Sequence, residues 1–170
     1  MVKSKVSNIQ DKQLEKEFPG FIYKIQIDKK TDIPNIEYVM NNDKNEKTIS
    51  LKGKEKPLDS FLKAMQDLSE IFCEICEIED KTDETLVTTV NFSEKGGVII
   101  SGQVNLTKNG IPQPLCMNTP HVLIEYNEKS YNLPEYAQKQ IKELKKQAIL
   151  YIKGEVAEKQ NGLFDEEAVN

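Results

Sequence analysis

The sequence predicts an α+β domain in which an antiparallel sheet of about six strands carries two helices on one face. Three observations lead to this prediction. Two long segments place apolar residues at helical spacing, short segments with alternating apolar residues precede each of them, and turn-forming residues separate the short segments. The resulting order is βββα followed by βββα, and this order alone suggests an internal duplication.

Three strands open the first half. The first has one predominantly apolar face, formed by the alternating residues Phe21, Tyr23, Ile25 and Ile27. The same period returns after Pro34, at Ile36, Tyr38 and Met40. The segment 41–45 has the composition of a turn, and a third short strand follows at Ile49 and Leu51.

A helix over residues 57–79 closes the first half. Pro57 suits its first turn, where the missing N–H costs little. The buried stripe is expected to consist of Leu58, Phe61, Leu62, Met65, Leu68, Phe72, Ile75 and Ile78. Charged and amide side chains occupy the opposite face, so this is an amphipathic helix that packs on the sheet.

The second half repeats the order. One strand contains Leu86, Val90 and Phe92, a turn follows at 94–97, and a long strand covers 98–106. Asn109-Gly110 is typical of a tight hairpin turn leading into a strand at 113–119, and 121–131 suggests a further hairpin. A helix begins around Asn132-Leu133-Pro134-Glu135 and ends at Gly154. Its predicted buried stripe is Ala137, Ile141, Leu144, Ala148 and Ile152.

These elements predict one α+β domain over residues 20–154, preceded by a polar N-terminal arm (1–19) and followed by a flexible acidic tail (155–170). No apolar run is long enough to span a membrane, and the N-terminus lacks the apolar segment of a signal peptide. Three cysteines form no disulfide framework, which fits a reducing compartment. We therefore expect a cytoplasmic protein that does not contact membranes.

All 23 basic residues are lysines. Arginine supplies the planar fork that reads guanine, so its absence argues against base-specific DNA recognition. Residues 1–57 hold 12 Lys and 9 acidic residues, whereas 58–170 hold 11 Lys and 19 acidic residues. A weak contact with single-stranded nucleic acid is one hypothesis, with Phe21, Tyr23 and Tyr38 as stacking rings beside Lys24. Burial of these rings in the core is the alternative.

Three thiols and one imidazole could in principle form a tetrahedral zinc site, from Cys73, Cys76, Cys116 and His121. The first two lie inside a predicted helix, where buried cysteine commonly acts as a small apolar residue, so no metal site is expected. His121 stands beside no serine flanked by glycines, and no nucleotide-binding loop is present. The sequence thus predicts a protein that is not an enzyme and needs no cofactor.

The tail contains the most specific pattern in the chain. Gln160, Leu163 and Phe164 form Gln-x-x-Leu-Phe, followed by the acidic residues 165–167. This pattern resembles the peptide by which bacterial DNA-processing proteins bind the sliding clamp, whose usual form is Gln-Leu-Ser/Asp-Leu-Phe. The alternative is that Leu163 and Phe164 fold back and cap the core.

Four further segments resemble small uncharacterised proteins of bacteriophages and prophages: 56–58, 97–102, 118–120 and 151–164. Together the two resemblances imply a phage-type accessory binding protein that acts in DNA replication or recombination, with a bacterial host protein, the sliding clamp first, as partner. Two alternatives stay open. One is an antagonist of bacterial immunity that masks an effector or sequesters a nucleotide messenger, and the other is a single-stranded DNA-binding protein. Self-association is compatible with each of them.

Overall fold

The computed structural model describes residues 18–42, 45–124 and 132–157. One antiparallel sheet has the strand order β3-β2-β1-β4-β5-β6, and a short β7 pairs with β5. The strands are β1 (Gly20–Ile27), β2 (Pro34–Asn42), β3 (Asn45–Lys52), β4 (Thr85–Phe92), β5 (Gly97–Lys108), β6 (Ile111–Asn118) and β7 (Val122–Leu123). The helices are α2 (Asp59–Gln66), α3 (Leu68–Ile75), the 3-10 helix η1 (Glu79–Glu84) and α4 (Glu135–Ile152).

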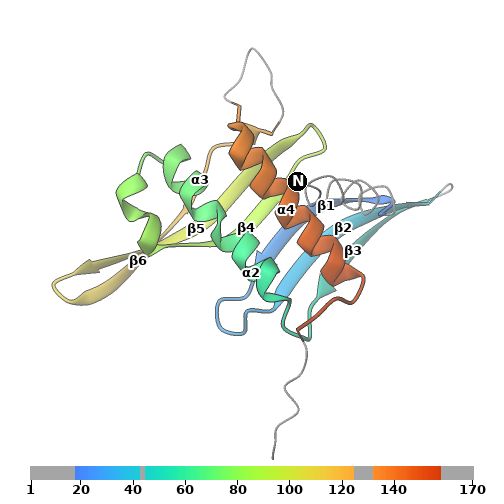
Figure 1. Ribbon diagram of the computed structural model, residues 1–170, viewed down its shortest axis with the longest axis horizontal. Coiled ribbons are helices and arrows are strands. Elements are labelled where there is room, and N and C mark those ends of the chain that lie inside the picture. Colours follow the sequence, from blue (N-terminus) through green and yellow to red (C-terminus); the bar gives the residue numbers. More distant parts are fainter. Residues whose placement is uncertain (1–17, 43–44, 125–131, 158–170) are drawn as a thin grey trace, which may run out of the picture.

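The helices α2, α3 and α4 lie across one face of this sheet (Figure 1). The predicted α+β class, with its antiparallel sheet, is therefore confirmed. In the sheet, β1 and β4 pair at the centre, and the later strands of each half continue outward to the two edges, β3 and β6. This arrangement is compatible with a duplication, which remains a hypothesis.

The central strands do not alternate as predicted. In β1 the register against β2 shifts between Ile22 and Lys24, and the buried side chains are Ile22 and Ile25, three positions apart. In β4 a second shift between Val87 and Thr89 likewise buries Val87 and Val90. A bulge inserts one unpaired residue and thereby reverses the inside–outside pattern that follows it. The predicted strict alternation of Phe21, Tyr23, Ile25 and Ile27 is wrong for this reason, although Ile25 is fully buried and Phe21 and Ile27 pack against the core.

The predicted helix 57–79 is also corrected, because it consists of two helices separated at Asp67 and ends at Ile75. Glu77 has a φ of 57°, in the left-handed region. Its N–H donates to the Glu74 carbonyl (3.2 Å), and the N–H of Ile78 donates to the Cys73 carbonyl (2.9 Å). These two bonds form a Schellman motif, which satisfies the last carbonyls of α3 and stops it.

Helix α4 ends in the same way, with glycine at the left-handed position. Gly154 has a φ of 99°, and the N–H groups of Gly154 and Glu155 donate to the carbonyls of Tyr151 and Leu150, both at 3.0 Å. Within the described part of the chain, no helix is both long and apolar enough to cross a bilayer.

The core lies between the helices and the sheet. Phe61, Leu68 and Phe72 are almost fully buried there, as are Ala137, Ile141, Leu144 and Ala148 of α4, so most of both predicted helical stripes is confirmed. Gln147 of α4 is a buried polar residue whose amide oxygen and amide nitrogen both form hydrogen bonds. Its Oε1 accepts a bond from Ser60 Oγ (2.8 Å) and its Nε2 donates to Glu143 (2.7 Å), which ties α4 to α2.

Candidate functional site

The predicted partner-binding residues Gln160, Leu163 and Phe164 lie outside the described residues, but the point from which that segment departs is defined. Val156 forms a β-bridge with Pro57, and the Ala157 N–H donates to the Lys56 carbonyl (3.0 Å). Residues 155–157, predicted to belong to the tail, therefore contact the folded part. The chain is attached next to the start of α2 up to Ala157, and Gln160 follows three residues later.

Tyr38 does not take the predicted role of an exposed stacking ring. It is 8% exposed, and its ring centroid lies 5.6 Å from that of Phe18, which belongs to the predicted N-terminal arm. A base stacks only on an accessible aromatic face. The alternative of core packing is thus the correct one for Tyr38.

Tyr23 and Lys24 both contact carboxylates. The Tyr23 hydroxyl donates to Glu94, and this bond is the main cause that raises the pKa of the phenol to about 12. Lys24 Nζ lies 3.4 Å from Glu37 Oε1. A nucleic-acid phosphate approaching Lys24 would meet Glu37, and one approaching Tyr23 would meet Glu94, and like charges repel. The electrostatics at each of these two positions therefore do not favour a polyanion.

Ser93 is a residue that the sequence did not single out. Its Oγ accepts a bond from the Gly97 N–H (3.0 Å) and lies 3.1 Å from Nε2 of His121, 28 positions away in the chain. In the tautomer whose Nε2 carries no proton the hydroxyl donates to the imidazole, an arrangement by which a base can activate a serine, and in the other tautomer Nε2 donates to Oγ. The same contacts also close the β4–β5 turn, because the Ser93 N–H donates to the Gly97 carbonyl (2.9 Å).

Close packing holds the imidazole in this place. A Cβ on Gly97 would lie 1.9 Å from Nε2 of His121, so the ring lies directly over the glycine backbone. The pairing of β7 with β5, through Val122 opposite Val98 and Leu123 opposite Gly97, positions the segment that carries His121. The local sequence around His121 contains no signal for this contact, which depends on the sheet.

Aromatic rings and one lysine lie at the same end of the central strands. Lys145 of α4 places its Nζ 4.4 Å from the ring centroid of Phe92 and 5.8 Å from that of Phe21. The rings of Phe21 and Tyr23 meet edge to face, with centroids 4.8 Å apart. A cation over aromatic rings is attracted by their negative faces, so Lys145 fastens α4 to β1 and β4.

The four residues weighed as zinc ligands are not brought together. Among the described residues, no three His, Cys, Asp or Glu side chains are placed to hold a metal ion. Cys73 is buried, Cys76 is half-buried and Cys116 is exposed on the edge strand β6. Burial raises the pKa of the Cys76 thiol, with the neighbouring Cys73 adding to this effect, which lowers its reactivity.

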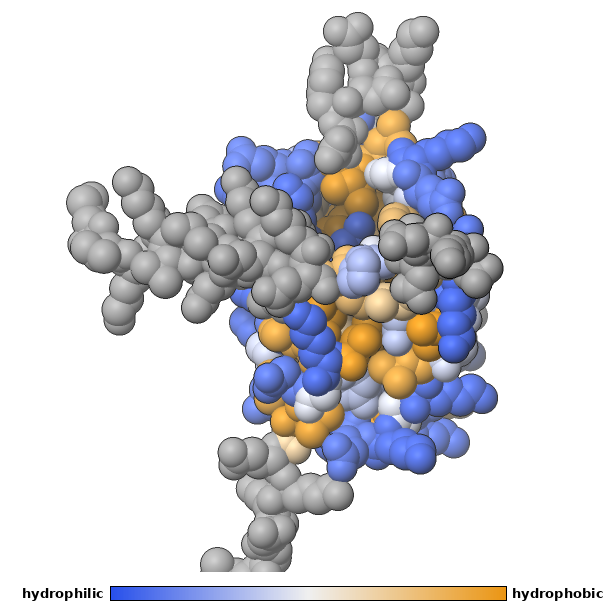
Figure 2. Space-filling model, turned by 90° about the vertical axis from the view of Figure 1, so that its right-hand side faces the viewer, coloured by the Kyte–Doolittle hydropathy of each residue, from blue (hydrophilic) through white to orange (hydrophobic). Residues whose placement is uncertain are grey.

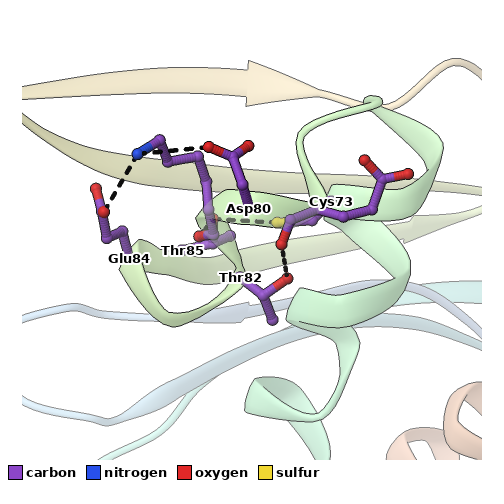
Figure 3. A network of polar contacts seen from close by, with 7 residues as sticks. Cys73, Asp80, Thr82, Glu84 and Thr85 are labelled. Atoms are coloured by element: carbon purple, nitrogen blue, oxygen red, sulfur yellow. Dashed lines mark hydrogen bonds and ion pairs between the residues drawn. The ribbon is translucent and has the colours of Figure 1, made fainter.

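Cys73 has a structural role instead, shown in Figure 3. Its Sγ lies 3.2 Å from Oγ1 of Thr85, and that hydroxyl donates to the Lys81 carbonyl (2.8 Å). The Lys81 side chain in turn pairs with Glu84 at 3.3 Å and with Asp80 at 3.7 Å. The network joins the end of α3 to η1 and to the start of β4.

Two open hollows of the described surface bear on the hypothesis of a nucleotide-sequestering site. One, of about 540 Å³, lies between η1 and the β5–β6 hairpin and includes Lys81. The other, of about 430 Å³, lies beside α2 and includes Lys63, which pairs with Asp67 at 2.7 Å. Each is lined by a single lysine that already has an acidic partner, and by no aromatic ring. A site that sequesters a nucleotide would combine several lysines with stacking rings.

Comparisons of the chain with protein-family models, curated proteins and solved structures found no match.

Proposed function

We propose that this chain is a non-enzymatic accessory binding protein of the phage type that acts in DNA replication or recombination. In this proposal the C-terminal segment binds the bacterial sliding clamp through Gln160, Leu163 and Phe164. The observation that carries the proposal is the Gln-x-x-Leu-Phe pattern itself, next to the acidic residues 165–167. Asn161 and Gly162 stand where the usual peptide has leucine and serine or aspartate.

The attachment of the chain at Ala157 supports this proposal. From Ala157 to Leu163 there are six residues, which span at most about 20–22 Å when extended. The peptide is therefore tethered close to the start of α2, and any clamp that binds it also comes near that end of the domain. A second contact from the domain would then form at a high effective concentration.

The expected affinity follows from burial of two apolar side chains. Placing Leu163 and Phe164 in a preformed pocket contributes about 1.5–3 kcal/mol each. Ordering the segment costs part of this. A hydrogen bond from Gln160 at the rim of the pocket adds about 1 kcal/mol. The isolated peptide should accordingly bind no more tightly than roughly micromolar.

The test uses the full chain and a purified bacterial clamp in a titration by calorimetry or surface plasmon resonance. Leu163→Ala combined with Phe164→Ala should abolish binding and leave the melting temperature unchanged. Glu166→Ala with Glu167→Ala is the matched control, since it alters the same tail outside the pattern and should leave most of the binding. If the Leu163/Phe164 variant instead loses several degrees of melting temperature, these residues belong to the core and the proposal fails. Undiminished clamp binding by that variant would refute it equally.

A further inference from the structure

The two edges of the sheet, β3 and β6, differ in what their backbones offer. In an antiparallel pair, residues alternate between positions bonded to the neighbouring strand and positions whose N–H and C=O point away. Gly53, which follows β3, donates its N–H to the Pro34 carbonyl (2.9 Å), so Gly53 is a position bonded to β2. Lys52 precedes Gly53 and lies opposite Asn35. Lys52 is therefore an outward position. Alternate residues of β3 share this orientation, namely Glu46, Thr48, Ser50 and Lys52.

Outward and bonded positions alternate along β6 in the same way. The Thr119 N–H donates to the Ile100 carbonyl (2.9 Å), and Asn118 is opposite Ser101. The outward positions of β6 are then Asn118, Cys116, Pro114 and Pro112. Proline has no N–H, so two of these four positions cannot donate to a further strand. The β6 edge is blocked in the way that natural sheets prevent edge-to-edge association.

The strand at the β3 edge, Asn45–Lys52, contains no proline. All four of its outward residues can donate an N–H, and all four are exposed. Their side chains also complement a reversed copy of the same strand, because an acid stands at one end, a lysine at the other and two hydroxyl residues between them. Ile49, at the centre, is only partly buried. Figure 2 shows the molecule from the right-hand side of Figure 1, where hydrophobic and hydrophilic residues both reach the surface.

We propose that β3 pairs antiparallel with β3 of a second copy of this chain, about a two-fold axis at Ile49, to form one continuous sheet. In this register Glu46 is opposite Lys52 of the partner subunit, and the symmetry produces the pair twice. Thr48 is opposite Ser50 of the partner subunit, and Ile49 is opposite its own copy. Opposite charges and apolar residues directly across an antiparallel pair stabilise it, whereas like charges destabilise it. A two-fold interface of this kind is self-complementary.

The charges also select this register over its neighbours. A shift by two residues in either direction takes Glu46 and Lys52 away from each other. Shifts that centre the pairing on either end of the strand bring two glutamates or two lysines together. A foreign extended strand without matching charges would lack both ion pairs. The charge pattern therefore favours a second copy of β3 as the occupant of this edge.

The experiment measures the dissociation constant of the full-length chain by sedimentation over a range of concentrations. The wild type should be a dimer. Lys52→Glu replaces two attractive pairs by two repulsive ones and should weaken the dimer by roughly tenfold or more. Adding Glu46→Lys to this variant exchanges the charges and should restore the dimer. Lys54→Glu is the matched control, because it makes the same charge change at an exposed position beyond β3 and should have little effect.

A second variant tests the backbone. Thr48→Pro removes an N–H that points away from β2, so it should abolish the dimer and preserve the β2–β3 pairing. Circular dichroism checks that Thr48→Pro is folded. If this variant does not fold, the charge exchange between positions 46 and 52 still tests the proposal. A wild type that is monomeric at all concentrations overturns the proposal. So does a dimer that Lys52→Glu leaves as tight as before, since association would then use another surface.

Discussion

Replacing Glu77 by glycine should stabilise the protein. Helices α3 and α4 both end in a Schellman motif, but α4 has Gly154 at the left-handed position, whereas α3 has Glu77 with a φ of 57°. A side chain with a Cβ is strained in this region, and glycine is not. The glutamate side chain is exposed, so its replacement leaves no cavity.

The magnitude follows from two opposing terms. The left-handed conformation costs an L-residue about 1–2 kcal/mol. Glycine loses about 0.5–1 kcal/mol more backbone entropy on folding than other residues do. Glu77→Gly should therefore raise the free energy of unfolding by about 0.5–1 kcal/mol, which corresponds to about 1–4 °C in melting temperature for a chain of this size. Gly154→Ala, at a φ of 99°, should produce the opposite change, a loss of roughly 1 kcal/mol.

Charge must be separated from backbone strain in this comparison. A carboxylate at the C-terminal end of a helix interacts unfavourably with the helix dipole, so removing it stabilises by about 0.3–1 kcal/mol. Glu77→Gln removes the charge and keeps the strain, and it is therefore the control. Urea unfolding of the three proteins gives both contributions. A glycine variant that is no more stable than the glutamine variant would show that the backbone at position 77 is not strained.

Two further predictions concern the end of the central strands. Gly97→Ala should displace the imidazole of His121, break its contact with Ser93 and lower the free energy of unfolding by about 0.5–1.5 kcal/mol. In a His121→Ala background the same change should cost much less. If the two losses of stability simply add in this double-mutant cycle, the imidazole does not pack on Gly97. The second prediction is a pH effect. The pKa of Tyr23 in the folded protein is about 12, above the ordinary phenol value of 10. The Tyr23–Glu94 bond therefore stabilises the fold fully below pH 10, and this stabilisation is lost as the pH rises from 10 to 12. Ultraviolet difference titration of wild type against Tyr23→Phe should show this phenol still protonated at pH 11, and Glu94→Gln should abolish that protection.

The sequence alone predicted those helices and turns whose characteristic residues lie within one short segment. The apolar stripe of α4 and the glycine at its end are local features, and both predicted the observed helix. Asn109-Gly110 predicted the β5–β6 turn, and both residues have the positive φ that such a turn requires. The end of α3 shows the limit of this approach, because glutamate at a left-handed position is no recognisable stop signal.

The candidate sites divide in the same way. The Gln160, Leu163 and Phe164 pattern is a linear feature that the sequence displays without any fold, and its function stays a prediction. Ser93 with His121, and Tyr23 with Glu94, are separated by 28 and 71 positions, so only the pairing of strands brings them into contact. Composition alone could not place Tyr38 inside the core.

By itself the sequence determined the fold class, the helical faces and the short turns, because local backbone preference and apolar periodicity act within a few residues. The tertiary structure decided where the bulges at Ile22/Lys24 and Val87/Thr89 reverse the buried face, since a bulge exists only relative to a paired strand. It also decided that β3 and β6 are the edges of the sheet. The prolines of β6 and the charges of β3 are visible in the sequence, but they bear on association only because these strands stand at the two ends of the described strand order.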